Sequence, residues 1–266
     1  HQGDRLQDAF RVVYLDNVLE SVPTLTGAPV AVGDVNGDGL DDLVRAFSPN
    51  TARLSFGGDL LPLTEVDLQL NRPVSALAIS DFDGDGAGDV LMGVPVAATV
   101  DSPEQPDQTG ACIPDELMIA YGSKLGLPEP PSSIGVVRPV IQFVSGRFWS
   151  TEDGYGDFAV ASQCNDGSSF ENVVLYGNAF RIEATPTALT VPLDGKREPL
   201  DPQHMFFADV VSTGSTEADF HNDLIVVGNL GTQGTHVAVY ASTGEADIHF
   251  KDPHAFGLPQ TVEGKL

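Results

Sequence analysis

The chain has 266 residues and a formal net charge of −25, with 38 Asp and Glu residues against 13 Lys and Arg. This balance argues against nucleic acid or an anionic membrane as a partner, because both require basic patches. No run of about 18 apolar residues occurs in the sequence, so we expect no membrane insertion. The 28 Gly and 19 Pro favour a turn-rich β fold, and the length suffices for one large all-β domain.

The first stretch with a pattern of candidate metal ligands is 33–44, GDVNGDGLDDLV, and the pattern is repeated at 80–91, SDFDGDGAGDVL. In both, oxygen-bearing side chains occupy positions 1, 3, 5 and 9 of a loop that has a glycine at position 6. Calcium takes six to eight oxygen ligands, and the glycine lets the loop turn back around the ion. Position 7 is included for its backbone oxygen. The predicted ligands are Asp34, Asn36, Asp38, Leu40 and Asp42, then Asp81, Asp83, Asp85, Ala87 and Asp89.

The flanks of the two loops decide which kind of calcium site they predict. A helix–loop–helix site needs a Glu at position 12, where this chain has Arg45 and Met92. On both sides of each loop stand short runs rich in Val, Ile and Leu, bounded by Gly and Pro, which read as buried strands. The unit is therefore predicted to be a β-hairpin whose turn is wrapped around a cation.

This unit resembles a known family. The pattern D-x-[ND]-x-D-G-x-x-D at Asp34–Asp42 and Asp81–Asp89, followed by an apolar strand, is similar to the FG-GAP repeats of integrin alpha chains and the related VCBS repeats. The resemblance implies a calcium-binding β-propeller of four-stranded antiparallel blades. It says little about the partner, because such repeats occur in adhesion receptors, lectins and accessory domains of enzymes.

The rest of the chain divides into repeats of the same kind. We expect a partial blade at 1–26, full blades at about 27–72, 73–136, 137–202 and 203–250, and a tail at 251–266. Each full unit is predicted to contain four strands, as a propeller blade does. The ring would have about five blades, with the first strands completing the last blade, or would be part of a larger ring.

The third and fourth repeats carry weaker versions of the loop. In the third, Asp153, Tyr155 and Asp157 fit positions 5, 7 and 9, but Trp149 stands at position 1 and cannot bind an ion. In the fourth, Asp209 and Asp223 stand where positions 1 and 9 should be, but 14 residues apart instead of 8. These five residues are weak metal candidates, and we expect about two bound calcium ions in all.

The two cysteines of the chain fall at equivalent places in neighbouring repeats. Cys112 follows the second predicted strand of the second blade, and Cys164 follows that of the third. Equivalent loops of adjacent blades lie side by side, so we expect a disulfide and an oxidising compartment: outside the cell, on its surface or in a periplasm.

The sequence shows no zinc-binding histidine pair, nucleophile elbow or phosphate-binding loop, so we expect no enzymatic activity. The favoured function is an extracellular, calcium-stabilised binding module that recognises protein or glycan through its blade loops. Two alternatives stay open: an accessory or catalytic propeller of a polysaccharide-degrading enzyme, and a purely structural scaffold domain.

Overall fold

The computed structural model describes residues 28–58, 64–96, 112–146, 154–164, 167, 169–179, 181, 187–193, 196–198, 200–208, 223–229, 234–240, 242–245, 248–250 and 254–257. Within these ranges every helix or strand assigned is a β-strand, so the predicted all-β class is confirmed. None of the described residues belongs to a helix long and apolar enough to cross a membrane. The predicted partial blade at 1–26 lies outside the described residues.

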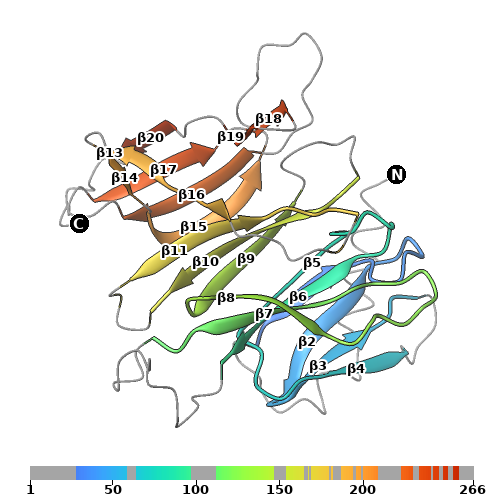
Figure 1. Ribbon diagram of the computed structural model, residues 1–266. Coiled ribbons are helices and arrows are strands. Elements are labelled where there is room, and N and C mark those ends of the chain that lie inside the picture. The colour runs from blue at the N-terminus through green and yellow to red at the C-terminus, as the bar shows by residue number, and fades with distance from the viewer. Residues whose placement is uncertain are drawn as a thin grey trace, which may run out of the picture.

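Sixteen of the strands form four antiparallel sheets, each with four strands (Figure 1). The first sheet contains β1 (Val30–Gly33), β2 (Asp42–Ser48), β3 (Thr51–Ser55) and β4 (Glu65–Gln69). The second contains β5 (Ala76–Ser80), β6 (Asp89–Pro95), β7 (Asp115–Ala120) and β8 (Ser132–Val137). In both, neighbours along the chain are neighbours in the sheet, which is the order that short connections favour.

The third and fourth sheets follow the same order. The third contains β9 (Val140–Gly146), β10 (Asp157–Gln163), β11 (Phe170–Leu175) and β12 (Thr187–Ala188). The fourth contains β15 (Asp201–Ala208), β16 (Asp223–Asn229), β17 (Thr235–Tyr240) and β20 (His254–Gly257). Two separate hairpins complete the description: β13 (Val191–Leu193) with β14 (Lys196–Glu198), and β18 (Ser242–Glu245) with β19 (Ile248–Phe250).

The fourth blade was predicted to end at about residue 250, and this boundary was wrong. The apolar run at 246–250 does not join this sheet, and β20 pairs with β17 instead, inside the segment that was expected to be a tail. The run contributes β19, which pairs locally with β18. A local hairpin closes a short loop at low entropic cost, so the run forms it in place of an outer sheet strand. The run 187–193 is similarly divided, because β12 joins the third sheet and β13 pairs with β14.

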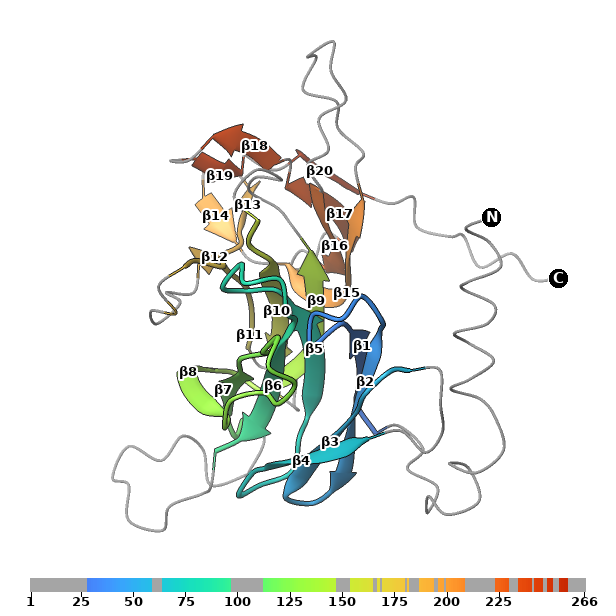
Figure 2. The same cartoon turned by 90° about the vertical axis from the view of Figure 1, so that its right-hand side faces the viewer.

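The sheets stack face to face, with their first strands together. β1 lies beside β5, β5 beside β9, and β9 beside β15, and Figure 2 shows these four strands near the centre of the molecule. Because alternate residues of a strand point to opposite faces, one strand can serve two cores. Val90 and Met92 of β6 pack toward the first sheet, and Leu91 packs toward the third. All three are fully buried, which contributes about 1.5–3 kcal/mol for each side chain.

Three apolar cores therefore join four successive sheets. The third core lies between the third and fourth sheets and contains Ala159, Val174, Leu224 and Val226. Among the described residues no comparable core joins the fourth sheet to the first, and Val30 and Val32 on the outer face of β1 are 54% and 60% exposed. The structure thus shows the stacked four-stranded sheets that were predicted, while closure of the sheets into a ring stays a prediction.

The two cysteines form a disulfide, as the positional argument predicted. Cys112 stands between β6 and β7, and Cys164 directly follows β10. Their Cα atoms are 4.5 Å apart, and the bridge joins residues 52 positions apart in the sequence. It ties the second sheet to the third at the ends of their second strands.

Candidate metal centre

The second acidic loop connects β5 to β6 and is folded by its own side chains. Gly84 and Gly86 have φ values of +74° and +85°, which residues with a Cβ rarely adopt. The Gly86 N–H donates to Asp81 Oδ2 at 3.0 Å, and the Ala87 N–H donates to Asp85 Oδ1 at 2.8 Å. The alternation of aspartate and glycine in the sequence therefore produces a tight turn, with the carboxylates on its inner side.

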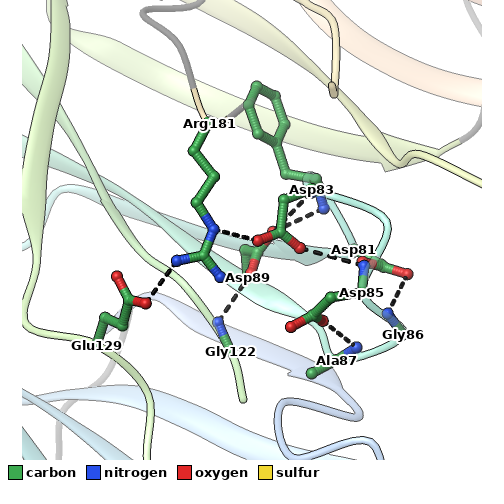
Figure 3. A network of polar contacts seen from close by, with 10 residues as sticks. Asp81, Asp83, Asp85, Gly86, Ala87, Asp89, Gly122, Glu129 and Arg181 are labelled. Carbon is green, nitrogen blue, oxygen red and sulfur yellow. Dashed lines mark hydrogen bonds and ion pairs between the residues drawn. The ribbon is translucent and has the colours of Figure 1, made fainter. Parts of the chain in front are cut away.

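Three carboxylates of this loop converge. One oxygen each from Asp81, Asp83 and Asp89 lie within 4.8 Å of one another (Figure 3). Oxygens that share a calcium ion at about 2.4 Å can be up to about 5 Å apart, so the spacing suits such an ion. Asp81 Oδ1 is buried and accepts no hydrogen bond from any described residue. A buried carboxylate oxygen without a donor is costly, and a bound cation would satisfy it. The residues present therefore fit a hard metal ion.

Asp89 is the innermost member of the cluster. It is fully buried, and its carboxylate accepts N–H bonds from Phe82 at 2.7 Å, Asp83 at 3.2 Å and Gly122 at 2.8 Å. Burial raises the pKa of Asp89 to about 7, and the backbone donors offset only part of that effect. A carboxylate oxygen has two lone pairs, so it can hold an N–H donor and still bind an ion. Asp89 is thus enclosed and held by backbone N–H groups of its own loop and of the segment that follows β7.

The first acidic loop, between β1 and β2, repeats these contacts. Asp42 is buried like Asp89 and accepts the N–H groups of Val35 at 2.8 Å and Gly57 at 2.7 Å. Burial raises the pKa of Asp42 as well. Asp34 differs from Asp81, because both of its oxygens accept loop N–H groups, from Asp38 at 3.0 Å and Gly39 at 2.8 Å.

The two loops also differ in how closely their carboxylates approach. Within the described ranges, Asp81, Asp83 and Asp89 are the one acidic group compact enough for a metal. The first loop has Asn36 where the second has Asp83, and the Asn36 side chain donates to Asp38 Oδ2 at 3.0 Å. Leu40, expected to contribute its backbone oxygen, is exposed, whereas its counterpart Ala87 is buried. The structure therefore supports a metal-compatible cluster most directly in the second loop.

The weak candidates keep one part of the pattern. Asp157, at the start of β10, is buried and accepts the Gly177 N–H at 3.0 Å, as Asp89 accepts that of Gly122. Asp223 is buried at the start of β16. The position-9 aspartate thus has a structural use even where position 1 offers no ligand. Asp153 and Asp209 lie outside the described residues.

The acidic loops of successive sheets are joined to one another through backbone contacts. The Gly88 N–H donates to Asp34 O at 2.6 Å, and the Gly156 N–H donates to Asp81 O at 2.5 Å. Tyr155, a weak metal candidate, lies with its ring against Gly84, where an added Cβ would be 2.5 Å from the ring. Tyr155 is therefore placed as a packing residue between the second and third loops.

Sequence reasoning missed a set of glycines that crowd these junctions. A Cβ at Gly122 would lie 2.4 Å from Gly88 O and 2.6 Å from Val35 O. A Cβ at Gly177 would lie 2.3 Å from Gly156 O. The signal that could have found them is the aromatic–glycine pair after the third strand of each of the first three sheets: Phe56–Gly57, Tyr121–Gly122 and Tyr176–Gly177.

A second omission is Arg181, which lies 98 residues after Asp83 in the sequence. Its Nε donates to Asp83 Oδ2 and its Nη1 donates to Glu129 Oε1 (Figure 3). No local pattern in the sequence predicted this contact, because Arg181 follows β11 of the third sheet.

A scan of the chain against protein-family models finds no match, and a search of curated proteins finds none either. The resemblance to FG-GAP and VCBS repeats therefore rests on the two acidic loops and their flanks.

Proposed function

We propose that this chain is a calcium-stabilised, non-catalytic recognition module of the β-propeller type that works outside the cell. The observation that carries the proposal is the convergence of Asp81, Asp83 and Asp89, with the buried Asp81 Oδ1 lacking a donor among the described residues. Oxygen ligands alone, in a loop turned by glycine, are the donor set that calcium prefers.

The role proposed for calcium is structural. Each acidic loop joins the first strand of a sheet to the second, next to the first strand of the following sheet. Clustered carboxylates repel one another, and burial has already raised the pKa of Asp42, Asp81 and Asp89. A divalent ion would neutralise them and fix the hairpin at the junction between two sheets. The proposed count is about two ions, one for each loop.

The extracellular setting is supported by the disulfide and agrees with the proposed calcium site. The Cys112–Cys164 disulfide is of a kind that persists in oxidising compartments. Calcium sites of extracellular modules work at dissociation constants of about 0.1–1 mM, which the calcium concentration inside cells does not reach. The strongly acidic composition fits a protein that meets abundant calcium.

Recognition is proposed to use the long connections between strands. The connection from β6 to β7 is a second-to-third link, and that from β15 to β16 is a first-to-second link. Because antiparallel strands alternate in direction, these two connections leave opposite ends of their sheets. They would therefore serve two different surfaces, and each can be tested separately by replacing 98–110 or 210–221 with a short Gly/Ser linker.

The metal proposal is tested by thermal unfolding with calcium and with EDTA, together with a count of bound ions. Saturation to about 100 times the dissociation constant stabilises the folded state by about 2.7 kcal/mol for each ion. For a domain of this size we expect a rise in Tm of about 10 °C or more. Absence of bound calcium and of any shift would reject the calcium site.

The recognition role is tested with a glycan array, a binding screen against extracellular proteins and an activity screen on polysaccharides. Binding without turnover, lost on replacement of one connection, supports the module. Turnover of a polysaccharide would reject the non-catalytic reading. Absence of both binding and turnover would leave the scaffold role.

A further inference from the structure

Arg181 is the one described cation that forms an ion pair with a carboxylate of either acidic loop. It reaches from the third sheet to the loop of the second sheet and joins Asp83 to Glu129 (Figure 3). Its guanidinium carbon lies 4.4 Å from the centre of the Tyr121 ring, so the cation also lies over an aromatic face. Contact with two carboxylates and an aromatic face fixes the guanidinium in one place.

The backbone of Arg181 supports the same conclusion. Its φ is +50°, and it is the one residue other than glycine with a positive φ in the described part of the chain. The left-handed conformation is unfavourable for a residue with a Cβ, so other contacts must offset it. The Arg181 side chain supplies those contacts through Asp83, Glu129 and Tyr121. Its position at the loop therefore follows from tertiary contacts and not from the backbone preference of the residue.

Asp83 belongs to this ion pair and to the metal-compatible cluster at the same time. Its Oδ2 accepts from Arg181, and its Oδ1 accepts the Asp85 N–H at 3.2 Å. Asp83 is nine-tenths buried, so its charge needs a counter-ion when no metal is bound. A divalent ion held by Asp81, Asp83 and Asp89 would share this carboxylate with the guanidinium, and the two positive charges would repel each other.

The geometry points to Arg181 as an internal counter-cation that neutralises the second acidic loop without metal and competes with calcium for Asp83. This inference rests on the proposed calcium site and adds a control on it. Calcium binding weakens the Arg181–Asp83 pair, and by linkage the pair weakens calcium binding to the same degree. Among the described residues the first loop has no such arginine. The Lys124 side chain lies against Gly37 of the first loop and Gly86 of the second, so it is common to both loops, and the proposed effect of Arg181 is specific to the second.

The test is calcium titration by calorimetry of wild type and Arg181→Gln, after removal of metal with EDTA. A single charge and a divalent ion about 5 Å apart repel enough, even at the dielectric constant of water, to change affinity about tenfold. We expect Arg181→Gln to tighten one of the sites about tenfold. Arg138→Gln is the matched control, because Arg138 pairs with Glu171 and Ser169, away from both acidic loops.

A second readout does not depend on calcium. In EDTA, Arg181→Gln should lower Tm, and its effect should shrink when Asp83→Asn is already present, because the partner charge is gone. If Arg181→Gln does not fold, Arg181→Lys replaces it. Lysine keeps the charge but cannot bridge Asp83 and Glu129 with a planar fork, so we expect a smaller gain in affinity in the same direction.

The outcomes separate the two proposals. A wild-type protein that binds no calcium overturns the calcium site itself. A wild-type protein that binds calcium, with an affinity that Arg181→Gln leaves unchanged or weakens, overturns the competition alone, since Arg181 would then be indifferent to the ion or would position Asp83 for it. A gain in affinity that Arg138→Gln reproduces also overturns the competition, because net charge alone would explain it.

Discussion

Gly122 offers the sharpest test of how the acidic loops are held together. It follows β7, donates its N–H to Asp89 Oδ1 at 2.8 Å, and lies where the first and second loops meet. A Cβ at this position would be 2.4 Å from Gly88 O and 2.6 Å from Val35 O. Both neighbours are backbone atoms, so Gly122→Ala can be accommodated only by moving one of the two loops.

The expected cost has two parts. Overpacking against backbone costs about 1–3 kcal/mol, and weakening the buried bond to Asp89 adds about 1–3 kcal/mol. Together they give about 4 kcal/mol, which lowers Tm by about 10 °C in a domain of this size. No positive φ is involved at Gly122, so the loss would report the close approach and not backbone strain.

The assay is thermal unfolding in EDTA, with Gly135→Ala as the control. Gly135 lies in β8 with nothing within 4 Å of its Cβ position, so its replacement should change Tm little. Gly177→Ala should behave like Gly122→Ala, because its Cβ would meet Gly156 O at 2.3 Å. A loss below about 1 kcal/mol for Gly122→Ala, or one equal to that of Gly135→Ala, would refute the close junction of the loops.

Three further predictions concern charge and cross-linking. Asp81→Asn should leave Tm unchanged or higher in EDTA, because burial has raised the pKa of Asp81 and its Oδ1 lacks a donor among the described residues. The same substitution should reduce the stabilisation by calcium. A calcium effect equal to that of wild type would show that Asp81 does not belong to the site. In EDTA, the free energy of unfolding of wild type relative to Asp89→Asn should fall by up to about 4 kcal/mol as pH rises from about 4 to about 7. The reason is that a carboxyl whose pKa is raised in the folded state stabilises that state while it is protonated. A difference that stays constant across this pH range, measured by denaturant unfolding, would contradict the assigned burial. Replacement of Cys112 and Cys164 by Ser should lower the free energy of unfolding by about 4 kcal/mol, because the bridge joins residues 52 positions apart. The loss should be seen as a lower Tm that reducing agent no longer changes. A Tm equal to that of the oxidised wild type would show that the bridge does not stabilise the fold.

The features of this protein that are local could be predicted from its residues. Loop ligands on alternate residues, a glycine at position 6 and flanking apolar runs all fall within about a dozen residues, so their pattern predicted each strand–loop–strand unit. The hydrogen bonds of Asp42 and Asp89 to the start of their own loops follow from the same short spacing. The disulfide was also accessible to sequence reasoning, because repetition places equivalent positions of neighbouring sheets side by side.

The other contacts between segments of different sheets could not be predicted, because they depend on how the sheets pack. The strand that pairs with β17 is β20 and not the run at 246–250. No local pattern in the sequence predicts which of two distant segments pairs with a strand. The glycines Gly122 and Gly177 are required by carbonyl groups from distant segments. Arg181 reaches Asp83 across 98 residues, and its charge acts there only because the third sheet stacks on the second. The geometry of a single loop can be predicted from the spacing of its residues, whereas a contact between sheets forms only when the buried faces of the sheets pack together.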